Sequence, residues 1–204
     1  PDRNEAALLG YYKNNIVHLF MFYSMICLSL KLVEKLSKKE ILKLILSVYP
    51  LLKRNYHLIW HEKEIEEVLE KSLDTITKLG LVKKNSSDIF VRPKRTEKNY
   101  ENFIAVSNIS ESSIKSIFIV IKTLIEKKCV ARDTLQDRCL EISKKLQTIE
   151  GWVYNEFFEL DKFNIHLENM VKEGYIKRDD LKNLVPTKIA LQARKNLESI
   201  FARA

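Results

Sequence analysis

The chain contains 204 residues with a mass of 24.0 kDa, a length that suits one or two small domains. Hydrophobic residues make up 46% of it and charged residues 30%, so the chain can bury a core and extensive disorder is excluded. Four Gly and four Pro are too few for the many turns of a large β-sandwich or a Rossmann fold. The sequence also lacks the glycine-rich phosphate loop of P-loop enzymes and kinases.

The net charge of +8 and the pI of about 9.3 favour an anionic partner, which could be nucleic acid, an acidic membrane surface or a phosphorylated small molecule. Cys27, Cys129 and Cys139 match no zinc-binding spacing, and their odd number favours reduced thiols in a cytosolic-facing compartment. The sequence begins at Pro1 without an initiator Met or a signal peptide, so we expect a piece of a longer protein.

The first expected helical segment covers residues 5–33, and residues 14–30 within it carry no formal charge. This run of 17 positions is at the low edge of what crosses a bilayer. It also contains polar residues, His18 and Ser24 among them, that are costly in hydrocarbon. The pattern therefore favours a buried helix over a membrane-surface helix, and both over a spanning helix.

Helices and one hairpin are expected in the next part of the chain. Ser37 and Glu40 have capping-box spacing at the start of a helix that Pro50 is expected to end or kink. A third helix begins near Glu62, and Gly80 occupies the position of a C-terminal capping glycine. Residues 81–92 then read as a two-stranded hairpin with a polar tip.

The C-terminal half is expected to be helical with a second hairpin. Helices are predicted over about 97–127 and over about 132–149, the latter ending at Gly151, followed by a helix capped by Asn155 and ended by Gly174. A hairpin is expected near 175–185, and Thr187 is expected to cap a last helix that runs through Phe201.

One internal repeat is visible in the sequence. LDTITKLGLVKK at 73–84 matches LENMVKEGYIKR at 167–178, with a constant offset of 94 residues that also brings Val91 onto Val185. Each copy reads as helix, Gly stop, short strand, polar tip and short strand. We therefore predict a mainly α protein, a helical bundle with two small winged-helix-like units that each carry a short β-hairpin.

Three segments are expected along the chain. Residues 1–56 form N-terminal helices, residues 57–96 form the first winged-helix-like unit, and residues 97–204 form a helical region that contains the second.

No constellation of catalytic or metal-binding groups is evident. His57 and His61 are four residues apart, but Leu58 stands where a zinc protease carries its general-base Glu, so a loop or helix start is the preferred reading. Each of these histidines also has a Glu five residues later, without the Asp of an acyltransferase His-x4-Asp motif. Cys139 is expected to be a buried structural thiol. No catalytic residue, metal or cofactor is therefore assigned.

Basic residues gather around the first hairpin. They form a candidate anion-binding or membrane-surface patch made of Lys83, Lys84, Arg92, Lys94 and Arg95, with Lys98 beside it. The helix that a winged-helix protein would place in the major groove of DNA opens with several glutamates, which repel phosphate. The pattern thus favours protein–protein or intramolecular packing, and nucleic acid is not the expected partner.

Several blocks, in order along most of the chain, resemble the C-terminal region of glycerol-3-phosphate 1-O-acyltransferases. The most specific is LLGYYKNNIVHLF at 8–20, in which Tyr12, Asn15 and His18 match the family block. The others are YPLLK (49–53), Trp60 with the acidic helix, LGLV (79–82), Arg92-Pro93, CLEISKKL (139–146), NEFFELDKF (155–163) and EGYI (173–176). Dihydroxyacetone-phosphate acyltransferases have a looser version of the first block.

The resemblance implies acyl transfer from acyl-CoA or acyl-carrier protein to glycerol 3-phosphate, in phospholipid biosynthesis, by a catalytic domain that lies upstream of this region. It also implies association with the cytoplasmic face of a bacterial inner membrane, or with an organellar membrane. Tyr12, Asn15 and His18 are expected to pack and hydrogen-bond, with the acyltransferase domain supplying partners. Residues 8–33 are expected to pack between domains, with Ile16, Leu19, Phe20, Tyr23 and Cys27 toward the core. The alternative is a winged-helix nucleic-acid-binding or protein-interaction scaffold.

Overall fold

The computed structural model describes the backbone of residues 3–85, 88–150 and 160–201, and the side chains of residues 17–85, 88–146, 148 and 162–199. The described chain is mainly helical, with small antiparallel sheets, as the sequence predicts. It divides into two compact units, residues 1–42 with 56–110 and residues 43–55 with 111–204. The three-segment division expected from the sequence remains a prediction.

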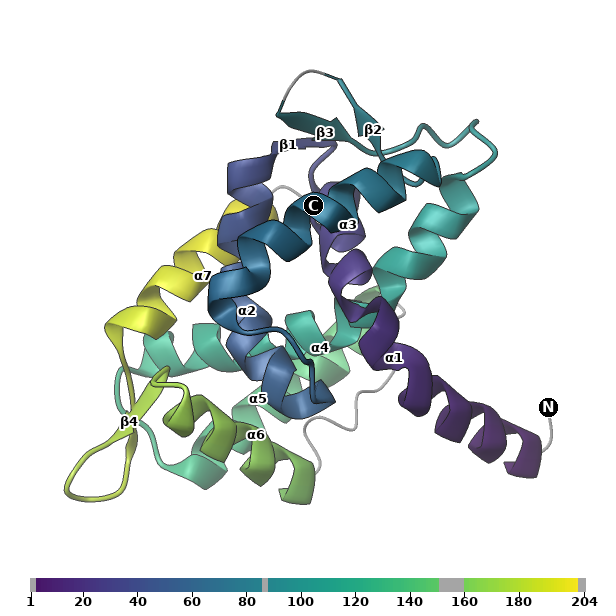
Figure 1. Cartoon of the computed structure of the whole chain (residues 1–204). Helices are drawn as coiled ribbons and strands as arrows, with labels where there is room; N and C mark the ends of the chain where they lie inside the picture. Colours follow the sequence, from purple (N-terminus) through teal and green to yellow (C-terminus); the bar gives the residue numbers. More distant parts are fainter. Residues whose placement is uncertain (1–2, 86–87, 151–159, 202–204) are drawn as a thin grey trace. The chain divides into compact units, whose positions relative to one another are not determined.

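The first unit combines long helices with a three-stranded sheet, seen at the top of Figure 1. Its elements are α1 (Arg3–Leu32), β1 (Lys35–Ser37), the first turn of α2 (Lys38–Tyr56), a 3₁₀ turn η1 (Glu62–Glu64), α3 (Ile65–Lys78), β2 (Lys83–Lys84), β3 (Ile89–Val91) and the start of α4 (Tyr100–Lys127). The strands pair antiparallel in the order β1-β3-β2. The expected hairpin is thus confirmed, and β1 adds a third strand too short to be recognised from the sequence.

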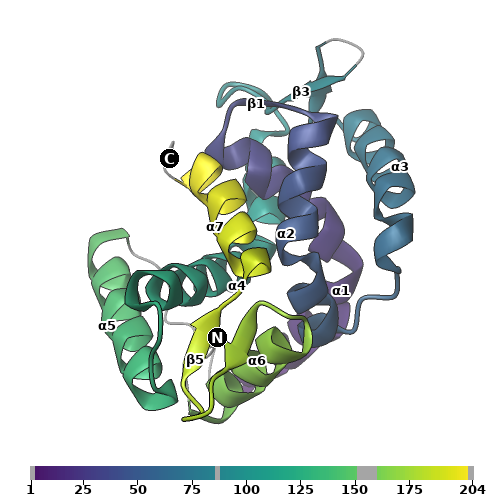
Figure 2. The same cartoon turned by 90° about the vertical axis from the view of Figure 1, so that its left-hand side faces the viewer.

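The second unit has the same kinds of element, several of which are visible in Figure 2. It contains the rest of α2 and α4, then α5 (Arg132–Glu150), α6 (Leu160–Lys172), β4 (Ile176–Arg178), β5 (Leu184–Pro186) and α7 (Lys188–Phe201). Strands β4 and β5 pair antiparallel, and Val130 forms an isolated antiparallel bridge with Leu184 of β5. The hairpin expected near 175–185 is therefore confirmed.

The 94-residue repeat extends well beyond the segment in which the sequence shows it. Helix α2 spans 38–56 and α5 spans 132–150, and both bounds differ by 94. The pairing of Leu36 with Phe90 in the first unit recurs 94 residues later as the pairing of Val130 with Leu184. Each copy thus consists of a helix, a short extended segment, two helices and a hairpin. The extended segment is strand β1 in the first copy and the single residue Val130 in the second, and it pairs with the second strand of the hairpin. The winged-helix assignment of these copies stays a prediction.

Local signals set most helix ends. The Ser37 hydroxyl accepts a hydrogen bond from the Glu40 N–H at 3.3 Å, and the Ser37 N–H donates to Glu40 Oε2 at 2.8 Å, which completes the predicted capping box. Thr187 Oγ1 likewise accepts from the N–H of Ile189 at 3.2 Å. Gly80 and Gly174 have φ of +70° and +74°, the left-handed conformation of a C-terminal cap. The predicted Asn155 cap and Gly151 stop lie outside the described residues.

Helix α2 continues through Pro50 to Tyr56. The sequence led us to expect that Pro50 would end or kink the helix, and the first of these outcomes is wrong. Proline has no backbone N–H, so the carbonyl of Leu46 lacks the hydrogen bond that it would otherwise accept from residue 50. Leu46 is 41% exposed, so water can reach that part of the helix. The buried Leu51 and Leu52 on the following turn keep the helix packed.

The buried face of α1 differs from the expected one. Leu19 and Phe20 were expected to face the core, but they are 56% and 43% exposed, and Tyr23 is half-buried. Cys27 is buried as expected, and Met21, Phe22 and Met25 are buried with it. The rings of Phe22 and Trp60 form a T-shaped contact with 5.5 Å between their centroids, which contributes to the burial of Phe22.

Candidate functional site

The five basic residues predicted as an anion or membrane patch lie on or just after the hairpin of the first unit. Lys83 forms an ion pair with Glu97 at 2.6 Å, and this contact, together with the Lys94 N–H, lowers the pKa of the Glu97 carboxyl. Lys84 Nζ lies 5.9 Å from the centre of the Phe90 ring. Arg92 is half-buried and donates to the carbonyl of Lys31 at 3.3 Å.

Within the described chain, Lys94 and Arg95 are the two residues of this predicted patch that are exposed and whose side chains make no hydrogen bond, ion pair or cation–π contact. Lys83, Lys84 and Arg92 are engaged in contacts that hold the hairpin in place. Binding of an anion or a membrane surface by this patch remains a prediction. Three of its five residues take part in local packing instead.

The three residues of the family-like block share helix α1. His18 is half-buried there. The side chains of Tyr12 and Asn15 lie outside the described residues, so the hydrogen bonding expected of this trio stays a prediction.

The histidines near residue 60 occupy structural positions. The backbone N–H of Glu64 donates to the His61 carbonyl at 2.9 Å, and the Glu64 carboxylate accepts from the His61 N–H at 2.6 Å, so His61 caps the start of η1. His57 is exposed, with φ of +52°, at the end of α2. These positions agree with the helix-start reading of the sequence.

The thiols of Cys27 and Cys139 are buried, which disfavours their reactive thiolate forms. Burial raises the pKa of Cys27 to about 12, and it raises the pKa of Cys139 to about 12 against a weaker opposing effect from Thr123. Since the thiolate is the nucleophilic form, neither is a nucleophile at neutral pH. Within the described ranges, no group of three or more His, Cys, Asp or Glu residues could hold a metal ion.

Helix α3 presents an acidic face. Glu66, Glu67 and Glu70 are exposed on it, and Glu67 pairs with Lys71 at 2.6 Å while Glu70 pairs with Lys38 at 3.1 Å. A helix with this surface is poorly suited to the phosphate backbone of DNA.

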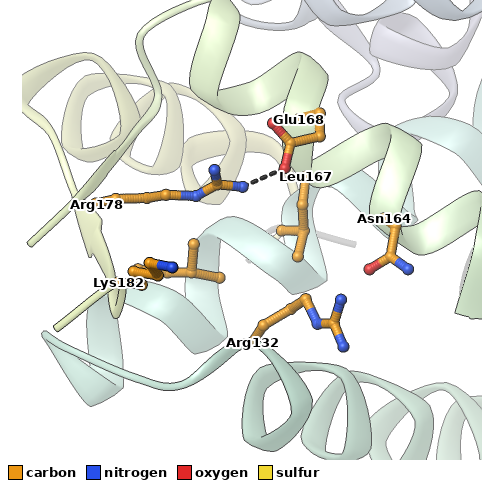
Figure 3. Close-up of a pocket in the computed structure, with 7 residues that line it drawn as sticks. Arg132, Asn164, Leu167, Glu168, Arg178 and Lys182 are labelled. Atoms are coloured by element: carbon orange, nitrogen blue, oxygen red, sulfur yellow. Dashed lines mark hydrogen bonds and ion pairs between the residues drawn. The ribbon is translucent and has the colours of Figure 1, made fainter.

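A basic pocket in the second unit was missed by the sequence analysis. It has a volume of about 590 Å³ and lies between α6, the β4–β5 hairpin and the first residue of α5. Figure 3 shows its cationic side chains reaching in from separate segments, namely Arg132, Arg178 and Lys182. These cations are scattered over 51 residues of sequence, so only the fold brings them to one place.

The hairpin turn that carries Lys182 is built around Asp179. Its carboxylate accepts from the N–H groups of Leu181 at 3.0 Å and Asn183 at 2.7 Å and from the Asn183 side-chain amide at 3.1 Å. The side-chain bond from Asn183 is the main cause of the lowered pKa of Asp179. This network supports a φ of +63° at Lys182.

Comparison with known proteins agrees with the resemblance seen in the sequence. Residues 1–179 match the family described as glycerol-3-phosphate acyltransferase C-terminal region. A glycerol-3-phosphate acyltransferase of Ectopseudomonas mendocina is 22% identical over 88% of this chain and 22% of its own length. One of Aeromonas hydrophila is 26% identical over 86% of this chain and 21% of its own length. No solved structure matches the chain significantly.

The chain spans about a fifth of the length of these curated relatives. The family match, in contrast, covers most of the 204 residues and includes the first copy of the repeat and the second copy as far as β4. The chain therefore belongs to the family of glycerol-3-phosphate acyltransferase C-terminal regions.

Proposed function

We propose that this chain is a non-catalytic C-terminal region that supports the acyltransferase domain of a glycerol-3-phosphate acyltransferase in phospholipid biosynthesis. The observation that carries the proposal is the family match, which is to the C-terminal region and covers residues 1–179. The matched segment is 21–22% of the length of these curated relatives, which leaves ample length for a separate catalytic domain.

The described side chains support a structural role. The capping role of His61 and the buried thiols of Cys27 and Cys139 serve folding. The proposal assigns acyl transfer from acyl-CoA or acyl-carrier protein to residues that the matched segment does not supply.

The proposed partner is the acyltransferase domain of the same parent chain, and α1 is the proposed contact. Leu19 and Phe20 are exposed on it, one to two residues after His18 of the family-like block. Exposed apolar side chains that lie together on a helix suit a contact with another protein surface.

Association with a membrane, at its cytoplasmic face, is the proposed location. Among the described helices, α4 is long and apolar enough to cross a bilayer by length and composition, and half of its most apolar window is buried in the structure. A buried core helix has the same properties, so the proposal rests on the family's substrate chemistry and on the net charge of +8.

We also propose that each copy of the repeat is a winged-helix-like unit used for packing. The support is the element order of helix, strand, two helices and hairpin, with the second hairpin strand between the other two in the first unit. Nucleic acid is not the proposed partner, because the exposed face of α3 is acidic.

An acyl-transfer assay tests the proposal. The 204-residue chain is incubated with glycerol 3-phosphate and labelled palmitoyl-CoA, with the full-length E. mendocina relative as the positive control. We expect no turnover by the chain, and loss of turnover when the matched segment is deleted from the relative. Turnover by the chain that survives repurification and the substitutions His57→Ala and His61→Ala would contradict the proposal, as would full activity of the truncated relative.

A further inference from the structure

The basic pocket of the second unit combines groups from three segments. Arg132 is the first residue of α5, Asn164 and Glu168 lie on α6, Arg178 ends β4, and Lys182 is in the turn after it. The pocket walls are therefore fixed by two helices and a hairpin, and the side chains in Figure 3 surround a common space.

The existing partners of these cations leave positive charge uncompensated. Arg178 pairs with Glu168, as the dashed line in Figure 3 marks. Arg132 pairs at 2.8 Å with its neighbour Asp133, whose side chain is 78% exposed and does not line the pocket. Such an exposed pair is weak in water. Lys182 is exposed and has no side-chain partner in the described part of the chain.

The first unit provides an internal comparison, because the 94-residue offset gives each pocket residue a counterpart. In the first unit Lys38 pairs with Glu70 at 3.1 Å. The counterparts of this pair are Arg132 and Asn164, so a neutral amide stands where the first unit has a carboxylate. The Oδ1 atom of Asn164 is buried and accepts no hydrogen bond within the described chain.

One further counterpart changes charge in the same direction. Lys182 of the second unit replaces Asp88 of the first, while Glu168 and Arg178 keep the charge of Asp74 and Lys84. The second unit thus has three cations against one carboxylate, a formal charge of +2. The first unit has two cations against three carboxylates, a formal charge of −1. The corresponding place in the fold therefore carries a net positive charge in the second unit but not in the first.

We propose that this pocket binds a phosphate group, with Arg132 and Lys182 as its main charge partners. Guanidinium and ammonium groups are the side chains that bind phosphate oxygens best. The volume of about 590 Å³ exceeds that of a bare phosphate ion and accommodates a phosphate ester.

The phosphate could belong to a soluble ester or to a lipid headgroup. Leu181, adjacent to Lys182, is 83% exposed, and the corresponding residue of the first unit is Ser87. An apolar tip beside a phosphate-binding pocket suits a lipid, whose phosphate lies next to hydrocarbon. Phosphate binding in this pocket does not depend on whether the chain is catalytic, so the two proposals can fail separately.

Calorimetry and vesicle sedimentation with the whole 204-residue chain test the proposal. The probes are inorganic phosphate and vesicles of phosphatidylcholine with and without phosphatidylglycerol. Asn164→Glu restores the carboxylate of the first unit opposite Arg132, and Lys182→Gln removes the unpaired cation. We expect each to weaken binding at least tenfold. Lys144→Gln, which changes an exposed residue of α5 outside the pocket by the same single charge, should leave binding unchanged.

The two probes separate the sources of the phosphate. Binding of inorganic phosphate that both pocket variants weaken supports the proposal for a soluble ester. Binding of phosphatidylglycerol vesicles that the pocket variants and Leu181→Ser weaken supports it for a lipid. Binding of neither probe, or equal binding by the pocket variants and Lys144→Gln, overturns it. Thermal unfolding followed by circular dichroism verifies that every variant is folded.

Discussion

We expect the stability of the folded chain to depend on pH through His166. Burial, with a smaller contribution from nearby Lys162, lowers the pKa of its imidazole to about 4. In an unfolded chain the same group titrates near ~6.5. Between these values the unfolded chain binds a proton that the folded chain does not bind. The free energy of unfolding therefore falls as the pH falls from 6.5 toward 4, by up to about 3 kcal/mol.

Urea unfolding at pH 7, 5.5 and 4.5 measures this effect. The variant His166→Gln should lose less stability than the original chain over that range, because glutamine does not titrate. His57→Gln changes an exposed histidine and serves as the control, with the pH dependence of the original chain. Equal slopes for the original chain and His166→Gln would show that the imidazole is not desolvated.

Cys129 should be the thiol that reacts first with a labelling reagent in the folded chain. It is exposed, whereas Cys27 and Cys139 are buried. Local desolvation and the Asp179 carboxylate, 3.5 Å from its Sγ, raise the pKa of Cys129, so labelling at pH 7 should be slow and should accelerate with pH. Mass spectrometry after iodoacetamide treatment should find one label on the folded chain and three in urea, and Cys129→Ser should remove the first. Early labelling of Cys27 would contradict this assignment.

At the scale of elements, the two glycine caps form a matched pair for mutation. Both have positive φ, so alanine is strained at either position. A Cβ at Gly174 would meet only the Ile189 side chain, at 3.4 Å, whereas a Cβ at Gly80 would lie 2.4 Å from Asn99 Nδ2. That amide donates to the Leu79 carbonyl at 3.2 Å, so Gly80→Ala must displace it.

We expect Gly174→Ala to lower the free energy of unfolding by about 1–2 kcal/mol, the cost of the left-handed conformation. Gly80→Ala should cost about 1 kcal/mol more, because a hydrogen bond is lost as well. Chemical denaturation measures both. Asparagine tolerates this conformation better, so Gly174→Asn is the control and should cost less than Gly174→Ala. An equal cost at the two glycines would show that Asn99 moves freely.

At the scale of the whole molecule, the exposed apolar residues of α1 should govern association. Leu19 and Phe20 are 56% and 43% exposed, and the proposed acyltransferase partner would cover them. In the isolated chain we expect concentration-dependent self-association in sedimentation experiments, which Leu19→Ser with Phe20→Ser should reduce. Leu191→Ser, at an exposed leucine of α7, is the control and should have little effect. A chain that stays monomeric at high concentration would count against α1 as a contact surface.

Local patterns in the sequence determined the helices, their caps and both hairpins. The Ser37 capping box, the Gly80 and Gly174 stops and the Thr187 cap act through neighbouring residues, so a short stretch of sequence contains all the groups involved. The family was also recognisable from the sequence, because its blocks keep their order along the chain. The packing of α1 could not be predicted from the sequence. The exposure of Leu19 and Phe20 contradicts the face expected for this helix, because its polar residues do not form one continuous stripe that would orient it.

Only the tertiary structure decided where the second-unit cations meet and how far the repeat extends. Arg132, Arg178 and Lys182 are separated by up to 50 positions and share no motif. The basic patch chosen from the sequence lay instead in the first unit, because neighbouring charges are the ones that a linear reading detects. Val130 is a single-residue bridge, so no periodicity could reveal it as the counterpart of Leu36. Pairing with a partner 54 residues away is a property of the folded chain alone.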